Sequence, residues 1–593
     1  MRHIALLLLS ATAMLGASVP ETTAMVSPAD AETGFAGLSA RYVDSIARFS
    51  PVSGTQLGDH RFDGKLPDIT AAGRARQIAF DRQLLADLAK IDMKALSREA
   101  QVDALILKNA LNYEIWDLEV LKSWSWNAQN YNDAAASALY TLAARDYAPW
   151  PQRLKAATAR MEALPAFLLE SRRQLIAAKV PEIYATMVAK QNSGIVDIAE
   201  TMLAPHSGEL TATDKARFDA ALTKLKAAVA DQQLWLDKQL TPTAKGDFRL
   251  GTTLYDQKMA FGLMSTMTRA DLKAKATGAV TAIRAEMYAL ARTVLSGKPD
   301  APALPDRPTA AQQQKAIEAA LALSYAKRPD RAGVMDAAKA TLASATDFVR
   351  EKDLVSLPKA PVKIIVMPKF QQGNAVAYCD PPGPLDKGQD TFYAISPIPD
   401  DWTDAQATSF LSEYNSYMIH DLSIHEAMPG HWLQIDHSNQ DKSVMRAVLG
   451  SGPFVEGWAV YTEGMMADAG YLGGDPLFKL TVLKMRLRSV TNTLLDIGVH
   501  TEGMTREAAM DLMMNTAFQQ EREASGKWVR AQLSSVQLLS YFSGYEEHMA
   551  MREEAKTRWG AKFDLKRYND AVLAHGSPPA RFVRQLIFDL PVQ

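Results

Sequence analysis

Between about Thr33 and Leu354, apolar residues recur at the three- and four-residue spacing that gives an α-helix one apolar face. These segments are rich in Ala, Leu, Lys, Arg and Gln, which favour helix. Proline-containing joints at 148–151, 241–243 and 298–309 interrupt the pattern. The clearest predicted helices are Arg74–Ile91, Ser97–Leu121, Trp150–Ala178, Ala212–Lys238 and Arg269–Leu295.

The pattern changes at Leu357, where short strand-like runs separated by Gly and Pro replace the helical spacing. Helical spacing returns after Trp402 and continues almost to the end of the chain. We therefore expect a mainly α protein of two helical lobes, with a small β-sheet just upstream of a histidine-rich helix. The three predicted strands are Lys363–Met367, Asn374–Cys379 and Thr391–Ile395.

The first residues are typical of an export signal. Arg2 and His3 precede an apolar run, Ile4–Ala17, which is shorter than the roughly 20 residues that span a bilayer. Removal near residue 24 would leave an N-terminal helical region, 25–355, and a region with the sheet and the candidate chemistry, 356–593. An uncleaved N-terminal anchor is the alternative. We expect an exported protein, in the periplasm of a Gram-negative cell.

Composition excludes several partners. The 65 Lys and Arg against 67 Asp and Glu give a net charge of -2, and no basic stripe for nucleic acid appears. No later apolar run could span a bilayer, so we expect no stable membrane insertion once the signal is removed. The length of 593 residues favours at least two lobes. The oligomeric state stays open.

Cys379 is the only cysteine, so the chain has no internal disulfide and no cysteine-based zinc cluster. It does not lie near the apolar N-terminal run, which argues against a lipid-modified N-terminus. A catalytic thiol is one interpretation. Its place in Ala-Tyr-Cys-Asp-Pro-Pro, where a strand runs into a turn, favours a small packed residue instead.

Four of the ten histidines fall within one short segment, and one of them begins a motif of metal chemistry. His425-Glu426 opens like H-E-x-x-H, in which two histidines one helical turn apart bind zinc and the Glu acts as base. Pro429 stands where that motif has its second histidine, and His431 follows two residues later. The four clustered positions are His420, His425, His431 and His437.

The departure from the motif has a geometric consequence. Six residues along an ideal helix put His431 roughly 120° away from His425, so one helix cannot point both at one ion. Pro429 lacks a backbone donor and Gly430 accepts unusual conformations. This pair predicts a break in the helix between the two histidines.

A third ligand and its supporting groups are sought downstream. Glu456 follows His431 by one helix and a turn, and Glu463 would share its helical face. We expect Glu456 to be the ligand and Glu463 an orienting or structural partner, with Asp436 and His437 as other orienting candidates. The opposing interpretation is a chance His-Glu pair at the end of an ordinary helix. Spacing alone supports a metal site and a chance pair about equally.

These residue types imply a mechanism. Zn²⁺ would polarise a scissile carbonyl and acidify water, and Glu426 would take the proton of that water and pass it to the leaving nitrogen. Stabilisation of the oxyanion requires a further Tyr, His or Arg donor from elsewhere in the chain.

The segment His-Glu-Ala-Met-Pro-Gly-His-Trp-Leu-Gln resembles the signature of the bacterial family called domain of unknown function 885, which is regarded as metallopeptidase-like. The resemblance implies a zinc-peptidase-like architecture, with His425, His431 and Glu456 as zinc ligands and Glu426 as base. It also nominates three catalytic residues from distant segments, His500, Tyr541 and Arg552. Other matching segments are 377–393, 455–461, 495–501, 537–552 and 575–579.

Two departures from the family pattern affect the expected site. Trp432 stands where many members have a further histidine, so no ligand is expected there. Asn492 stands where some members have Arg, which bears on substrate preference if that Arg binds a substrate carboxylate.

Three functions follow. The first is an exported zinc metallopeptidase that hydrolyses short peptides or peptide-like small substrates. The second keeps the metal and hydrolyses non-peptide or cell-wall-derived amides. The third is a non-catalytic helical periplasmic binding protein whose histidines are structural.

Overall fold

Helices make up most of the chain in the computed structural model, as the apolar spacing predicted. Side chains that accept backbone N–H groups begin several of them: Ser97 accepts from Ala100, and Thr268 forms a capping box with Asp271. The helix after Thr268, α12, has the predicted bounds. The five predicted helices correspond to α3 (Ala71–Leu88), α4 (Arg98–Trp116), α6 (Trp150–Gln174), α9 (Ala212–Trp235) and α12 (Arg269–Leu295).

The structure describes residues 28–367, 376–386, 388–399 and 402–593. The expected export signal, 1–24, lies outside these residues, as does the start of the predicted strand Asn374–Cys379. No helix within the described ranges is long and apolar enough to cross a membrane.

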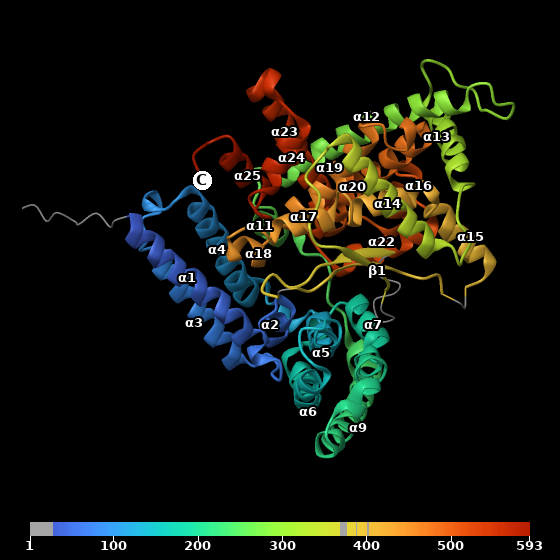
Figure 1. Ribbon diagram of the computed structural model, residues 1–593. Helices are drawn as coiled ribbons and strands as arrows, with labels where there is room; N and C mark the ends of the chain where they lie inside the picture. The colour runs from blue at the N-terminus through green and yellow to red at the C-terminus, as the bar shows by residue number, and fades with distance from the viewer. Residues whose placement is uncertain (1–27, 368–375, 387, 400–401) are drawn as a thin grey trace, which may run out of the picture.

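The N-terminal helices form two groups with separate hydrophobic cores. The first group, α1, α3 and α4, buries Phe35, Leu84 and Leu107 and also packs against Met445 of the C-terminal region. The second, built on α5, α6, α8 and α9, buries Leu139 and Leu164 and extends to one side of the molecule (Figure 1). The remaining helices before α12 are α1 (Pro28–Phe49), α2 (Pro51–Leu57), α5 (Gln129–Ala143), α7 (Glu182–Gln191), α8 (Gly194–Ile198), α10 (Thr241–Thr243) and α11 (Gly251–Leu263).

A three-stranded sheet lies just upstream of the histidine-rich helix, as predicted. Its order is β1-β3-β2, with β1 (Val362–Val366) parallel and β2 (Ala377–Asp380) antiparallel to the central β3 (Thr391–Ile395). Tyr393, on β3, is buried, and its hydroxyl lies 3.4 Å from Ser423 Oγ. The sheet therefore packs on the helix that carries His425.

Arg145 joins the N-terminal helices to this sheet. It pairs with the carboxylate of Asp380 at 2.8 Å and donates to the carbonyl oxygens of Asp380 and Pro381, at the end of β2. Because the Arg145 guanidinium has several acceptors at the end of β2, it fixes both the orientation of that strand end and its distance from the N-terminal helices. The N-terminal region thus supports the strand that borders the candidate site.

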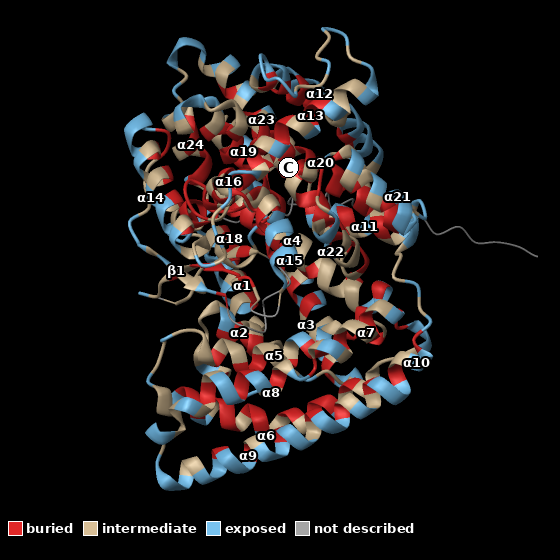
Figure 2. Cartoon of the chain, turned by 90° about the vertical axis from the view of Figure 1, so that its right-hand side faces the viewer, coloured by how far each residue is buried: buried red, intermediate tan, exposed pale blue. Residues whose placement is uncertain are grey.

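The main hydrophobic core contains residues from both sides of the expected boundary between residues 355 and 356. Ala276 on α12, Ile317 on α13 and Val349 on α14 pack in the same core as Trp458 and Leu483 of the C-terminal region. Figure 2 shows the resulting buried interior around α16, α19, α20 and α23. The other core helices are α13 (Ala310–Tyr325), α14 (Val334–Lys352), α16 (Ser416–Glu426), α19 (Gly452–Asp468), α20 (Pro476–Thr501), α23 (Ser540–Trp559), α24 (Leu565–Leu573) and α25 (Ala580–Ile587).

Helices α19 and α23 cross backbone to backbone. A Cβ on Gly457 would lie 2.3 Å from the carbonyl carbon of Gly544, and a Cβ on Gly544 would lie 1.9 Å from the carbonyl oxygen of Pro453. Beside the crossing, His548 Nε2 donates to the Phe454 carbonyl at 3.0 Å, and burial lowers the pKa of this imidazole to about 4. Two glycines therefore set the distance between the helices that carry Glu456 and Tyr541.

Gly544→Ala should destabilise the protein by about 2 kcal/mol or more, because the new methyl group overlaps backbone that cannot move without separating α19 from α23. Thermal denaturation followed by circular dichroism measures the loss. The matched control is Gly278→Ala on α12, where nothing lies within 4 Å of the new Cβ. That variant should be neutral or more stable by up to about 1 kcal/mol. Equal melting temperatures for the two variants would contradict the close crossing.

Candidate metal centre

A break between two helices brings the two histidines of the motif together. Helix α16 ends at Glu426 and α17 (His431–Ser438) begins at His431. The Gly430 N–H donates to the Ile424 carbonyl at 2.9 Å, and the Met428–Pro429 peptide bond is cis. The break that the Pro-Gly pair predicted is therefore present.

Close backbone packing requires glycine at position 430. A Cβ there would lie 1.9 Å from the carbonyl oxygen of His425. The backbone angles at Gly430, φ -77° and ψ -127°, lie outside the helical and extended regions, as the Pro-Gly pair predicted.

Trp458 ties the same turn to α19. Its indole Nε1–H donates to the Pro429 carbonyl at 2.9 Å, and the side chain is fully buried. Glu456 lies two residues earlier on the same helix. The turn that joins the two histidines is thus fixed to the helix that supplies the carboxylate.

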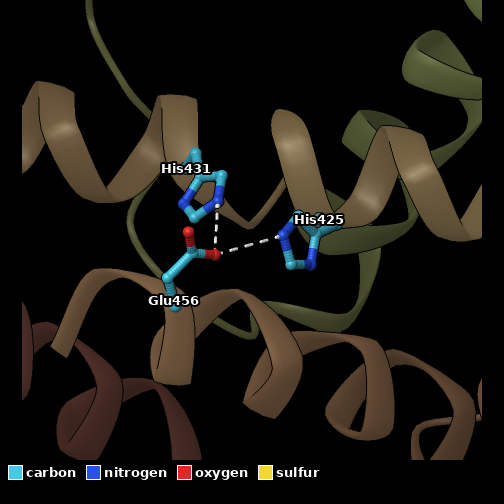
Figure 3. A group of neighbouring side chains, drawn as sticks. All are labelled: His425, His431 and Glu456. Atoms are coloured by element: carbon cyan, nitrogen blue, oxygen red, sulfur yellow. Dashed lines mark ion pairs between the residues drawn. The ribbon is translucent and has the colours of Figure 1, made fainter. Parts of the chain in front are cut away.

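His425, His431 and Glu456 converge on one point (Figure 3). Glu456 Oε2 lies 3.7 Å from His425 Nε2 and 3.5 Å from His431 Nε2. One potential ligand atom from each of the three residues lies within 4.8 Å of the other two. We call these residues the triad.

The triad fits a tetrahedral cation. Ligands held about 2.0 to 2.1 Å from Zn²⁺ lie roughly 3.4 Å apart, close to the separations of the two nitrogens from the carboxylate oxygen. Glu456 Oε2 is buried and has no hydrogen-bond partner among the described residues. Two imidazoles and one carboxylate form a donor set typical of catalytic zinc, which leaves a coordination position for water or substrate.

Glu463 orients His425 toward this point. His425 Nδ1 donates to Glu463 Oε1 at 2.7 Å, which leaves Nε2 facing Glu456. Glu463 is only 2 % exposed. Of the two carboxylates weighed as third ligand, the structure places Glu456 in the triad and Glu463 behind His425.

A further carboxyl group behind the triad was not found from the sequence. Asp421 lies one helical turn before His425, is buried, and has no hydrogen-bond partner for either oxygen among the residues described. Burial, and then the charge of Glu463, raise its pKa well above the ordinary value. Its position four residues before a predicted ligand was the available signal.

The triad holds opposite charges together in a protected setting. Burial alone would raise the pKa of Glu456, but His425 and His431 hold it well below its usual range. Burial would likewise lower the pKa of His425, but Glu456 and Glu463 raise it well above 6.5. Without a divalent cation, a proton on imidazole therefore supplies the positive charge that these carboxylates need.

Glu426, the predicted general base, lies at the edge of the sheet. Its Oε2 accepts the Cys379 N–H of β2 at 3.0 Å. Burial is the main cause that raises its pKa, and Glu456 contributes in the same direction. Burial and the nearby Glu426 raise the pKa of the Cys379 thiol as well, which keeps it uncharged and favours the packed interpretation of this cysteine.

Tyr541 lies beside the triad, and Arg530 lies beside Tyr541. The Tyr541 ring is stacked 6.5 Å from the His425 ring, centroid to centroid. Burial, and then Glu456, raise the pKa of its hydroxyl, so Tyr541 stays a neutral donor. Arg530 Nη2 donates to the Tyr541 hydroxyl at 3.2 Å. Arg530 was not predicted, because no spacing in the sequence connects it with the triad.

His500 and Arg552, nominated through the family resemblance, have other partners. His500 Nε2 donates to the carbonyl oxygens of Ala531 and Ser534, and its ring lies against Phe248 and Tyr255. Arg552 lies 5.7 Å from the centre of the Tyr461 ring. It follows Tyr541 by eleven residues on α23, a rise of about 16 Å. Among the described residues, the contacts of both side chains are with groups outside the triad.

The other clustered histidines also have contacts outside the triad. His420 Nδ1 lies 2.8 Å from the Tyr471 hydroxyl, and burial lowers its pKa to about 4. His437 Nε2 donates to the Ser356 carbonyl at 2.8 Å, and Asp436 accepts the Lys359 N–H. Asp436 and His437 thus connect α17 to the segment before the sheet.

In chelator-treated protein, Glu463→Gln should lower the free energy of unfolding, and the loss should depend on pH. The raised pKa of His425 means that its charged form stabilises the fold fully below about pH 6.5, and that this contribution is lost as pH rises through the folded-state pKa. The melting temperature of wild type should exceed that of the variant most below about pH 6.5, with a smaller difference at alkaline pH.

Thermal denaturation between about pH 5 and pH 9 measures this difference. Glu502→Gln, which alters a partly exposed carboxylate paired with Lys273, is the control and should show a constant difference over this range. A constant difference for Glu463→Gln would contradict the coupling of His425 to Glu463.

Comparison with known proteins identifies relatives of the whole chain. The sequence profile of the family described as "Bacterial protein of unknown function (DUF885)" matches residues 51–587, and the chain belongs to this family. A candidate lipoprotein of unknown function from Shewanella oneidensis is 33% identical, with a TM-score of 0.80, over 93% of this chain and 99% of that one. A candidate lipoprotein from Colwellia psychrerythraea, 16% identical over 94% and 99% of the two chains, has a TM-score of 0.72 and shares the fold. No curated protein matches the chain.

Proposed function

We propose that this member of the DUF885 family is a zinc-dependent hydrolase of peptide bonds, acting on short peptides. The observation that supports it best is the convergence of His425 Nε2, His431 Nε2 and Glu456 Oε2, with the carboxyl group of Glu426 in the residue that follows His425. A structural zinc site would use all four positions for protein ligands, whereas this set supplies three.

When bound, Zn²⁺ would supply the Lewis acidity that polarises a scissile carbonyl and acidifies water. Glu426 would accept a proton from the attacking water and transfer it to the leaving nitrogen, a role favoured by its raised pKa. The Cys379 N–H bond to Oε2 keeps the carboxyl group in one orientation. The neutral Tyr541 hydroxyl would donate a hydrogen bond to the developing oxyanion.

The same proposal includes export to the cell envelope, with the periplasm as the compartment. The apolar run Ile4–Ala17 supports export, and the Shewanella and Colwellia relatives are described as candidate lipoproteins. Short peptides or peptide-like fragments in that compartment would then be the substrates.

Metal content tests the ligand set. Wild-type protein purified without added chelator should hold about one zinc per chain, and His425→Ala, His431→Ala and Glu456→Ala should each lose most of it, measured by inductively coupled plasma mass spectrometry. His206→Ala, a partly exposed histidine stacked on Trp150, is the control and should keep its zinc. Unchanged zinc in all three triad variants would refute the metal centre.

Glu426→Gln tests the chemistry. It should keep its zinc and lose about 10²- to 10⁴-fold in the rate of hydrolysis, because only proton transfer is removed. Liquid chromatography of a panel of di- and tripeptides and of acyl-amino acids measures the rates. Full activity in this variant would rule out Glu426 as base, and hydrolysis of the acyl-amino acids alone would support the non-peptide amidase instead.

A further inference from the structure

Arg530, near the end of helix α22 (Glu521–Leu533), has no anionic partner in the described part of the chain. Its two hydrogen bonds both come from Nη2, to Gln537 Oε1 at 2.7 Å and to the Tyr541 hydroxyl at 3.2 Å. Both acceptors are neutral. The side chain is half-buried, and Nε and Nη1 donate to no described residue, so these N–H groups of a permanently charged guanidinium are available to a ligand.

The charges around Arg530 do not compensate it. Glu523, one carboxylate on the same helix, already pairs with Arg488, accepts the Tyr414 hydroxyl at 3.0 Å and lies 3.7 Å from Lys527 Nζ. Burial, and then the charges of Arg488 and Arg530, lower the pKa of Lys527 well below its ordinary value. Glu523 is thus paired with other cations, and the charge of Arg530 has no carboxylate partner among the described residues, which favours an anionic ligand.

The position of Arg530 relative to the triad limits what that ligand is. One hydrogen bond joins Arg530 to Tyr541, and one ring contact joins Tyr541 to His425. An extended peptide advances by about 3.5 Å per residue. An anionic group on Arg530 would thus be separated from a scissile bond at the triad by about one to three residues.

We propose that Arg530 binds the free C-terminal carboxylate of the substrate, so that the protein removes one to three residues from the C-terminal end of peptides. A carboxylate would accept charge-assisted hydrogen bonds from the Nε or Nη1 N–H groups of Arg530, which are stronger than bonds between neutral groups. Gln537 holds Arg530 in place for this role. The inference rests on the proposed hydrolysis: water adds OH to the acyl carbon and a proton to the nitrogen of the released fragment, and no other reactant is required.

Two N-acetylated tripeptide libraries of the same composition test the assignment, one with a free C-terminal carboxylate and one with a carboxamide. Mass spectrometry follows the loss of each library. Wild type should cleave the free-acid library about 10- to 100-fold faster, the range expected for hydrogen bonds to a charged group. Arg530→Met should lower the free-acid rate to the carboxamide rate, mainly through KM, and Arg530→Lys should keep part of the preference.

Arg522→Met is the matched control, since Arg522 lies on the same helix and packs 4.1 Å above the Trp402 ring. It should leave the preference unchanged. Melting temperature and zinc content should be the same in all variants. Equal losses on both libraries in Arg530→Met would overturn the proposal and make Arg530 a positioning residue for Tyr541. Preferred cleavage of carboxamides that contain Asp or Glu would also overturn it, because the bound carboxylate would then belong to a side chain.

A binding measurement distinguishes failure of the carboxylate site from failure of the proposed hydrolysis. Calorimetric titration of Glu426→Gln with N-acetyl-trialanine and with its carboxamide should show about 10- to 100-fold tighter binding of the free acid, lost in the double variant with Arg530→Met. If wild type cleaves neither library but this preference persists, hydrolysis is refuted and the carboxylate site stands. If the two peptides bind equally, the carboxylate site is refuted whatever the hydrolysis shows.

Discussion

The carbonyl of His425 and the α-carbon of Gly430 are in such close contact that no side chain fits between them, and the arrangement of the triad depends on this contact. It ends α16 at Glu426 and starts α17 at His431, so that two histidines six residues apart face one point, whereas on one continuous helix they would lie roughly 120° apart. The Trp458 indole holds the Pro429 carbonyl of the same turn. Glu456 is therefore carried to the histidines by the helix that also fixes the turn.

A second constraint is the close contact between helices α19 and α23. The backbones of α19 and α23 touch at Gly457 and Gly544, which brings Tyr541 close to the helix of Glu456. The N-terminal region contributes through Arg145, whose ion pair with Asp380 holds the strand next to Glu426. Side chains from three parts of the chain thus converge because close backbone contacts and the Arg145 ion pair set the distances.

Charge explains why this arrangement favours a bound cation. Glu426, Glu456, Glu463 and Asp421 are carboxyl groups around two imidazoles, away from bulk water. Buried carboxylates are costly unless a positive charge or hydrogen bonds compensate them. A proton on His425 compensates them in part, and a divalent cation would do so more completely. Arg530, which has no carboxylate partner among the described residues, carries the opposite charge, which suits a substrate whose end is an anion.

The sequence by itself determined the helices, the three strands and the break at Pro429-Gly430, because each depends on local spacing and local backbone chemistry. It also brought forward His425, His431 and the two candidate carboxylates, because metal-binding residues have characteristic neighbours. Only the tertiary structure decided that Glu456 faces the histidines while Glu463 lies behind His425, since both share one helical face. Tertiary packing alone separated Tyr541 from His500 and Arg552, and it alone revealed Asp421 and Arg530. Which partner a side chain meets depends on how distant helices cross, and no local pattern in the chain records that crossing.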